Sequence, residues 1–218
     1  MKLKGREHIH FIGIGGIGMS AIAFVLLKMG HKVSGSDAKA SKITQKIEGS
    51  GGKFYLGHDS KNIKGADIVV FSSSITPENP ELKAARDRKV PTLHRADMLA
   101  LIMNGRKGIA VTGAHGKTTT SSLIAHILFK AGLDPTAILG GEVKSLGGNA
   151  RTGKGEYFVV EADESDGSFV HLKPFYGVVT NIDAEHLDYY RNMGEIISWY
   201  LKFIGNIKPG GKLFACGD

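Results

Sequence analysis

One glycine-rich segment in the second half of the chain has the residue types of a phosphate-binding loop. The segment is Gly113-Ala114-His115-Gly116-Lys117-Thr118-Thr119. In such a loop the backbone amides surround phosphate oxygens, a lysine such as Lys117 reaches the β- and γ-phosphates, and a hydroxyl such as that of Thr118 binds Mg²⁺. His115 would stand near the γ-phosphate. We therefore predict ATP and Mg²⁺ binding, although Val111 replaces the first glycine of the usual G-x-x-x-x-G-K-S/T pattern and an incidental turn is the alternative.

A carboxylate that could share the Mg²⁺ follows a short apolar run. Glu161 comes directly after residues 157–160, which we predict to be a buried strand, and Asp163, Glu164 and Asp166 follow it. In nucleotide-binding α/β proteins an acidic group at the end of a neighbouring strand helps to hold the metal. This much negative charge is unfavourable unless a cation or the basic loop offsets it. We select Glu161 as a metal ligand and catalytic group; for its neighbours, a solvated acidic loop is the alternative.

A histidine follows the next predicted strand. His186 lies just past residues 177–180, on the side where ligands gather in open α/β sheets. Its imidazole would bind a second divalent cation when neutral. On spacing alone a structural or exposed histidine is the commoner case. Asn181, which lies between the strand and the histidine, would cap a helix or contact the nucleotide.

A second glycine loop lies near the N-terminus. It is Gly13-Ile14-Gly15-Gly16-Ile17-Gly18, which satisfies G-x-G-x-x-G between a predicted strand and a predicted helix. Glycine lets the backbone turn sharply and approach a pyrophosphate at the positive end of the helix. Asp37 ends the next predicted strand, where a carboxylate accepts hydrogen bonds from a ribose hydroxyl. By itself this half predicts a nicotinamide-dependent dehydrogenase, and glycines used only for tight packing are the alternative.

These loops need strands and helices that alternate along the chain. Strands are predicted at residues 8–12, 32–36, 53–56, 67–72, 108–112, 157–160, 177–180 and 212–215, and helices at residues 17–29, 78–88, 94–103, 117–131 and 195–204. Such alternation is typical of α/β folds with mostly parallel sheets. The polar residues 104–107 predict a boundary between a first domain of residues 1–105 and a second of residues 106–218. The six glycines within residues 140–155 predict a mobile loop.

The composition excludes several classes of protein. The 218 residues include 42% hydrophobic and 22% charged residues, which is typical of a folded domain. The net charge of +7 suits anionic partners, but only 8% of residues are aromatic and no dense basic stripe supports nucleic-acid binding. One cysteine excludes an internal disulfide, and no signal peptide or membrane span is evident. We therefore expect a cytoplasmic protein with neither a membrane nor a nucleic-acid partner.

Taken together, four segments resemble the ATP-dependent Mur ligases of bacterial peptidoglycan synthesis. They are residues 8–20, 113–120, 161–166 and 181–188, and they occur in the family order. Ala114 stands where the family usually has threonine, a change of little consequence because the backbone binds the phosphates. The similarity runs through the whole chain, and the first segment is most similar to members that attach L-alanine.

The resemblance implies a Rossmann-like domain followed by a truncated P-loop α/β domain that binds ATP. The first would hold the UDP part of UDP-N-acetylmuramate through Gly13, residues 15–18, Asp37 and the turn Ser72-Ser73-Ser74. In the second, Lys117 would contact the phosphates, Thr118 and Glu161 one Mg²⁺, and His186 a second. The implied reaction forms an acyl phosphate, from which the amine of L-alanine displaces phosphate.

The family has a third domain, which recognises the amino acid, and we expect this chain to be an N-terminal portion that ligates poorly alone. Two other enzymes remain open as alternatives. One is a relative that attaches a recycled peptide, and the other is a nicotinamide-dependent oxidoreductase. A nucleotide-sensing or nucleic-acid-binding module is a third alternative, motivated by the positive charge.

Overall fold

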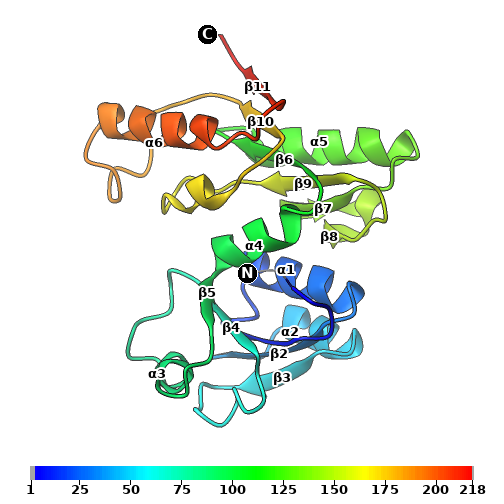
Figure 1. The fold of residues 1–218 in the computed structure, drawn as a ribbon, viewed down its shortest axis with the longest axis vertical. Helices are drawn as coiled ribbons and strands as arrows, with labels where there is room; N and C mark the ends of the chain where they lie inside the picture. Colours follow the sequence, from blue (N-terminus) through cyan, green and yellow to red (C-terminus); the bar gives the residue numbers. More distant parts are fainter. Residues whose placement is uncertain (1–2, 218) are drawn as a thin grey trace. The chain divides into compact units, whose positions relative to one another are not determined.

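A computed structural model describes residues 3–217 and divides the chain into two units, one ending at Met98 and the other beginning at Leu99 (Figure 1). Each unit has its own sheet with helices on both faces. The division falls inside helix α4 (Arg95–Met103), and the polar residues 104–107 follow that helix. The expected α/β class is confirmed in both units.

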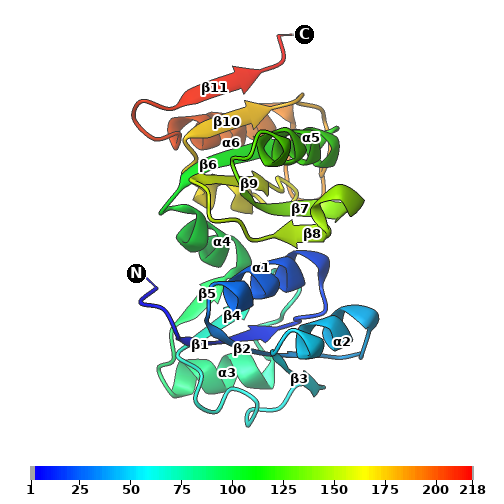
Figure 2. The same cartoon turned by 90° about the vertical axis from the view of Figure 1, so that its right-hand side faces the viewer.

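Unit 1 is built on a five-stranded parallel sheet in the order β3-β2-β1-β4-β5. Its strands are β1 (His8–Ile12), β2 (Lys32–Asp37), β3 (Lys53–Leu56), β4 (Ile68–Phe71) and β5 (Thr92–His94). Its helices besides α4 are α1 (Ile17–Lys28), α2 (Lys42–Gly49) and α3 (Pro80–Asp87), with α1 and α2 on one face of the sheet and α3 on the other (Figure 2). The central β1 is buried along its whole length. This order matches strands 3-2-1-4-5 of the six-stranded dinucleotide-binding fold, in which ligands bind beyond the carboxyl ends of the strands.

Two elements of unit 1 were not expected from the sequence. Helix α2 has only eight residues, two of them buried, and it begins at a capping box in which the Ser41 side chain accepts from the Thr44 amide and Thr44 Oγ1 accepts from the Ser41 amide. Threonine replaces the usual glutamate of that box, which weakens the sequence signal. Strand β5 has only three residues. Elements this short rely on packing against the sheet rather than on their own periodicity.

Unit 2 is built on a six-stranded sheet in the order β11-β10-β6-β9-β7-β8. Its strands are β6 (Lys107–Thr112), β7 (Thr136–Val143), β8 (Gly148–Arg151), β9 (Tyr157–Glu161), β10 (Tyr176–Val179) and β11 (Lys212–Ala215). Helices α5 (Lys117–Lys130) and α6 (Met193–Gly205) lie on opposite faces, and two 3-10 turns span Lys144–Leu146 and Ser168–His171. All pairings are parallel except β7 with β8. The parallel strands β6, β9 and β10 therefore end at one edge of the sheet.

The expectation of a mobile loop at residues 140–155 was wrong. Most of this segment forms the end of β7, a 3-10 turn and the antiparallel strand β8. Its glycines allow close approach of other groups rather than motion. A Cβ on Gly153 would come within 2.0 Å of the Asp134 carbonyl oxygen, and one on Gly155 within 1.9 Å of the Leu133 carbonyl oxygen. A high glycine content predicts a mobile loop only where no neighbouring part of the chain packs closely against the glycines.

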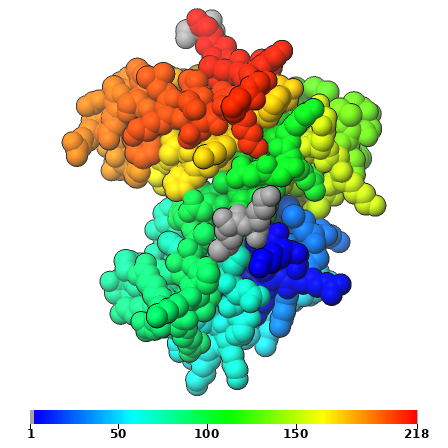
Figure 3. All heavy atoms as spheres, viewed as in Figure 1, coloured from blue at the N-terminus to red at the C-terminus, as the bar shows by residue number. Residues whose placement is uncertain are grey.

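Helix α6 carries exposed apolar side chains along one row. Met193, Ile197 and Leu201 are spaced four residues apart and are all exposed, and the helix lies at the surface of unit 2 in the space-filling view (Figure 3). Strand β11 forms an exposed edge of the sheet. None of the helices within residues 3–217 is long and apolar enough to cross a lipid bilayer.

Candidate functional site

The phosphate loop connects β6 to α5 and depends on two glycines. Gly113 has φ +137°, and a Cβ there would lie 2.0 Å from Thr180 Oγ1. Gly116 has φ +80° and precedes the first residue of α5. A side chain at the first position would collide with the end of β10, and one at the second would be strained. The backbone amides at the start of α5 are therefore placed as the pattern predicts for an anion-binding turn.

The loop is tied to the residues that follow β10. The His115 amide donates to Asn181 Oδ1 (2.8 Å), and Asn181 Nδ2 donates back to the His115 carbonyl (3.0 Å). Thr180 Oγ1 donates to the same carbonyl at 2.6 Å, and the Ala114 amide donates to the Asn181 carbonyl at 3.2 Å. Asn181 thus acts as a strap on the loop backbone, a role that was not expected from the sequence. Its expected contact with the nucleotide stays a prediction.

Lys117 lies over its own loop with its ammonium group held by three acceptors. Nζ donates to the carbonyls of Gly113 (2.7 Å) and Ala114 (3.1 Å) and to Glu164 Oε1 (2.8 Å). The side chain of Lys117 is 17% exposed and that of Glu164 only 4%. These contacts keep the ammonium group at the loop, which is where a phosphate-binding lysine is expected.

Glu164 is a functional candidate that sequence reasoning did not select. Burial raises the pKa of its carboxyl above the usual value, and the hydrogen bond and positive charge of Lys117 offset only part of that effect. Its Oε2 atom is buried and has no hydrogen-bond partner among residues 3–217. Tyr190 donates its hydroxyl proton to the Glu164 carbonyl, which anchors this part of the acidic loop. The sequence signal was present, because Glu164 is one of the acidic residues after β9, but their pattern does not show which one turns inward.

Glu161 and Thr118 both border the glycines of β7. Glu161 Oε2 accepts from the Gly140 amide at 3.0 Å. A Cβ on Gly141 would lie 3.3 Å from Thr118 Cγ2. The structure therefore brings Thr118 and Glu161 to the same stretch of β7, next to the phosphate loop.

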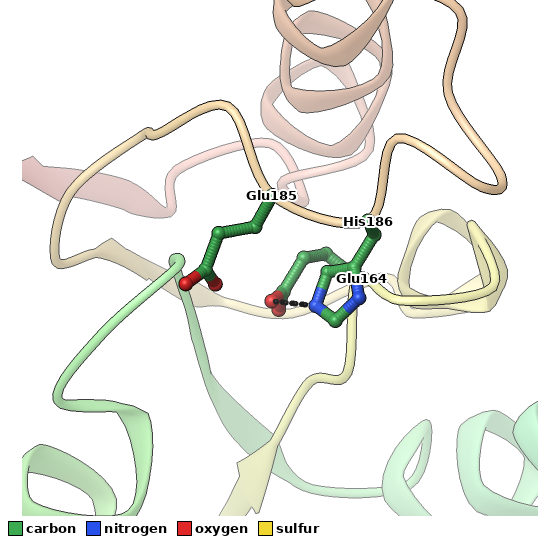
Figure 4. A group of neighbouring side chains, drawn as sticks. All are labelled: Glu164, Glu185 and His186. Atoms are coloured by element: carbon green, nitrogen blue, oxygen red, sulfur yellow. Dashed lines mark ion pairs between the residues drawn. The ribbon is translucent and has the colours of Figure 1, made fainter.

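His186 lies beside Glu164 rather than Glu161. Its Nε2 atom is 3.5 Å from Glu164 Oε1, and ligand atoms of Glu164, Glu185 and His186 lie within 4.8 Å of one another (Figure 4). His186 has φ +56°, a conformation that non-glycine residues rarely adopt. His115 faces acidic groups, with Nε2 at 3.6 Å from Glu185 Oε1 and 3.9 Å from Asp183 Oδ2.

In unit 1 the N-terminal glycine loop is largely bonded to itself and to β2. The amides of Gly13 and Ile14 both donate to the Ser36 carbonyl (2.8 and 2.9 Å), and the Gly16 amide donates to the Gly13 carbonyl (3.2 Å). The amide of Gly15 donates to Asp37 Oδ2 at 2.9 Å. The backbone amides that remain available to an anion are thus those of the first turn of α1, which lack acceptors inside the helix.

Other predicted residues of unit 1 lie at the ends of β4 and β5. The turn of Ser72, Ser73 and Ser74 follows β4, and Ser73 Oγ is 3.0 Å from His94 Nε2 at the end of β5. Arg95, the next residue, lies against the start of α1, because a Cβ on Gly18 would be 3.1 Å from Arg95 Nη1. Sequence reasoning missed His94 and Arg95, since no motif surrounds them and only the strand order brings them to α1.

Comparisons with known proteins match both units. Residues 8–107 match the model of the Mur ligase family, catalytic domain, and residues 111–218 match that of the Mur ligase middle domain. The proteins named UDP-N-acetylmuramate--L-alanine ligase in Geotalea uraniireducens and Geobacter sp. (strain M21) are 51% and 53% identical to the chain over 212 residues. Those residues are 97% of this chain and 46% of each relative, so the chain spans about half the length of the curated relatives it matches.

Solved structures agree with these matches. The UDP-N-acetylmuramate-alanine ligase MurC of Thermotoga maritima has a TM-score of 0.85 and 32% identity, covering 97% of this chain and 53% of that one. The UDP-N-acetylmuramate:L-alanyl-gamma-D-glutamyl-meso-diaminopimelate ligase of Neisseria meningitides has a TM-score of 0.90 and 29% identity, covering 98% of this chain and 72% of that one. The order of the two matched domains, the phosphate loop and the two sheets all lead to one conclusion: the chain belongs to the Mur ligase family.

Proposed function

We propose that this chain is the part of an ATP-dependent ligase that binds UDP-N-acetylmuramate and ATP, in an enzyme that joins the sugar acid to L-alanine during peptidoglycan synthesis. The curated relatives at 51% and 53% identity, which carry the name of that ligase, support the choice of substrates. The observation that carries the proposal is Lys117, held over a strand–loop–helix turn with buried Glu164 beside it. If an anion binds at the loop, this pair of charged side chains would take part in its binding.

The proposed reaction has two balanced steps. A carboxylate oxygen of the sugar acid attacks the γ-phosphorus of ATP, the bond to the β-phosphate oxygen breaks, and ADP leaves. The amine of L-alanine then attacks the acyl carbon, inorganic phosphate leaves, and the nitrogen loses a proton. Lys117 would stabilise the charge that develops on the transferred phosphoryl group. His115, at the exposed end of the loop, would lie near the same group.

The donor groups around the loop fit a divalent cation. Thr118 and Glu161 offer a hydroxyl and a carboxylate beside β7, and His186 offers an imidazole. The buried, unpartnered Oε2 of Glu164 is a further oxygen of the kind that Mg²⁺ prefers. When bound, Mg²⁺ would neutralise charge on the phosphate oxygens. We propose Thr118 and Glu161 for one ion and His186 for a second.

We propose that unit 1 holds the UDP moiety at the carboxyl ends of β1, β4 and β5. The first turn of α1 and the guanidinium of Arg95 would contact the diphosphate, because cations and helix N-termini both favour anions. The Ser72–Ser74 turn would contact the remainder of the nucleotide, and Asp37 would keep the glycine loop in shape through the Gly15 amide. The nicotinamide-dependent alternative leaves Lys117 and its carboxylates without a role.

Calorimetry with separate ligands tests the assignment of one ligand to each unit. UDP-N-acetylmuramate and ATP·Mg²⁺ are titrated into the chain and into the Asp37→Ala and Lys117→Ala variants. We expect Asp37→Ala to weaken only the UDP-sugar and Lys117→Ala to weaken only ATP. Tighter binding of NAD than of the UDP-sugar would overturn the proposal. The expectation that these 218 residues ligate poorly alone is checked by phosphate release with L-alanine, where turnover like that of a full-length relative would contradict it.

A ligase that attaches a peptide is the second candidate. It is favoured by one observation, the TM-score of 0.90 to the L-alanyl-gamma-D-glutamyl-meso-diaminopimelate ligase of Neisseria meningitides. A panel of amino acid and peptide substrates, tested on a protein as long as the curated relatives, separates the two. The cytoplasmic location expected from the sequence stays a prediction.

A further inference from the structure

A buried acid in unit 1 binds the end of β2 from the face of the sheet that carries α3 (Figure 2). Glu81 lies in the first turn of α3, and its side chain is fully buried. Its Oε2 atom accepts from Ser36 Oγ, and its Oε1 atom accepts from Asn62 Nδ2 at 2.7 Å. His58 Nδ1 lies 2.9 Å from Ser36 Oγ and 3.3 Å from Glu81 Oε2. One carboxylate thus connects α3 to β2 and to the segment that follows β3.

The end of β2 also holds the N-terminal glycine loop. The carbonyl oxygen of Ser36 accepts from the amides of Gly13 and Ile14 at 2.8 and 2.9 Å. Asp37, the next residue, accepts from the Gly15 amide through Oδ2 at 2.9 Å. Ser36 therefore bonds the buried acid with its side chain and the glycine loop with its carbonyl group. A shift of Ser36 would move the loop and the first turn of α1 that follows it.

The charge of Glu81 makes its bond to Ser36 a strong one. Burial raises the pKa of this carboxyl group, but the neighbouring imidazole of His10 and the hydrogen bonds from Ser36 and Asn62 outweigh burial and hold the pKa below its usual value. The Nε2 atom of His10 is buried without a hydrogen-bond partner among residues 3–217, and it lies 3.7 Å from Glu81 Oε1, where a proton on this nitrogen would face the carboxylate. A hydrogen bond to a charged acceptor is about twice as strong as one between neutral groups, so Ser36 is held firmly.

We propose that Glu81 is a positioning residue for UDP-sugar binding, which acts through Ser36 on the N-terminal glycine loop. The inference rests on the proposed function, which places the UDP moiety beside the first turn of α1. With Ser36 fixed, the amides of Gly13 and Ile14 stay bonded to its carbonyl, and the first turn of α1 keeps the geometry that a diphosphate needs. Without the bond to Glu81, this geometry is only part of the population, and the measured affinity falls by that fraction.

Calorimetry with UDP-N-acetylmuramate and, separately, with ATP·Mg²⁺ tests the role of Glu81. Glu81→Met keeps the length of the side chain and removes both acceptors. We expect it to weaken UDP-sugar binding by about three- to tenfold and to leave ATP binding unchanged, because the loop belongs to unit 1. Glu81→Gln restores one acceptor and should recover part of the affinity. Glu78→Gln, at an exposed position just before α3, is the matched control and should change neither affinity.

Two results with Glu81→Met would overturn the proposal. One is a folded variant that binds the UDP-sugar as tightly as the unmodified chain. The other is equal weakening of both ligands, which would mean that the substitution damages the chain as a whole. Circular dichroism establishes that each variant is folded, and if Glu81→Met is not, Glu81→Gln and Ser36→Ala decide the question.

A double-mutant cycle tests whether Glu81 acts through Ser36. Ser36→Ala removes the hydroxyl, keeps the carbonyl and should weaken UDP-sugar binding by a similar factor. Glu81→Met should have little further effect in that background, because the connection is already broken. Fold-changes that simply multiply would overturn the connection. Ser34→Ala is the matched control and should have little effect, because Ser34 is a buried serine of the same strand whose hydroxyl contacts His8 and His10 instead of Glu81.

Hydrogen exchange of the amides of Gly13 and Ile14 reports on the loop itself. Both amides donate to the Ser36 carbonyl, so we expect them to exchange faster in Glu81→Met and Ser36→Ala than in Ser34→Ala. Weaker UDP-sugar binding with unchanged exchange at these two amides would contradict the positioning role.

The same measurements separate this inference from the proposed function. If the unmodified chain binds the UDP-sugar and the variants of Glu81 and Ser36 bind it equally well, the inference is refuted and the proposed function stands. If the unmodified chain binds no UDP-sugar, the proposed function is refuted, and hydrogen exchange at residues 13 and 14 then decides whether Glu81 positions the loop.

Discussion

Gly140 in β7 lies against the side chain of Glu161 at the end of β9. A Cβ added to Gly140 would come within 2.3 Å of Glu161 Oε1, while the Gly140 amide donates to Oε2 at 3.0 Å. The amide of Gly140 therefore holds the Glu161 carboxylate, and the missing side chain of Gly140 leaves the space that this carboxylate occupies. A residue in a stretch expected to be a mobile loop is thus part of the proposed metal site.

Gly140→Ala should displace Glu161. We expect a loss of about 1 to 3 kcal/mol in the free energy of unfolding, because the new methyl group overlaps a held side chain. ATP·Mg²⁺ affinity should fall as well, which calorimetry measures. Gly205→Ala, at the exposed end of α6 where a Cβ meets no other described residue within 4 Å, is the control and should leave both quantities nearly unchanged. If the two variants have equal free energies of unfolding and equal ATP·Mg²⁺ affinities, Gly140 does not position Glu161.

Asn181→Ala should loosen the phosphate loop. It removes the two side-chain hydrogen bonds to the backbone of His115, each worth about 0.5 to 1.5 kcal/mol. We expect faster hydrogen exchange of the amides at residues 113–116 and weaker binding of a fluorescent ATP analogue. Asn104→Ala, at an exposed position in the same unit, is the control. Unchanged exchange in the loop would contradict the role of Asn181 as a strap.

Arg95→Ala should weaken UDP-sugar binding and leave ATP binding unchanged. The guanidinium lies beside Gly18 at the start of α1, and a charge-assisted contact to a phosphate contributes about 1.5 to 3 kcal/mol, or roughly tenfold or more in affinity. Calorimetry with UDP-N-acetylmuramate measures the change. Arg86→Ala removes the same charge from an exposed position on α3 and should have little effect. If both variants bind the UDP-sugar equally well, Arg95 is not part of the site.

Acid should destabilise unit 1 through Glu81. This carboxylate is fully buried, accepts from Ser36 Oγ and from Asn62 Nδ2 (2.7 Å), and lies 3.7 Å from His10 Nε2. Burial raises its pKa, but the neighbouring imidazole of His10 and the hydrogen bonds from Ser36 and Asn62 outweigh burial and hold the pKa below the usual 4.5. A lowered pKa means that the folded state favours the charged form. The stabilisation is therefore present above pH 4.5 and is lost as the pH falls through the lower, folded-state pKa.

Glu81→Gln tests this pH dependence. At pH 7 we expect it to lower the free energy of unfolding by about 1.5 to 3 kcal/mol, because bonds to a charged group are lost. The difference from the unmodified chain should shrink as the pH falls below 4.5. Denaturation followed by circular dichroism at several pH values measures both effects. Glu78→Gln, at an exposed position just before α3, is the control, and a constant difference between the Glu81 variant and the unmodified chain across the pH range would refute the assignment.

The sequence predicted most of the longer elements and the chemistry of both loops. Strands such as β1 and β6, and helices such as α1 and α5, have strong local signals because an apolar run, a glycine turn and a helix follow in order. The short elements α2, β5 and β8 and the longer strand β7 were not predicted, because they depend on neighbours far along the chain. Glycine at residue 140 favours a loop locally, yet the approach of Glu161 decides its place in a strand.

What the sequence determined by itself is the chemistry available: a lysine in a glycine loop, carboxylates after one strand and a histidine after the next. Only the tertiary structure decided which acidic side chain contacts which basic side chain. The parallel order of β6, β9 and β10 brings residues 117, 164 and 186 together, and it directs Glu164 rather than Glu161 to the lysine. The physical reason is that a residue type and its spacing set what a side chain can bond, whereas burial and strand order set which partner is within reach.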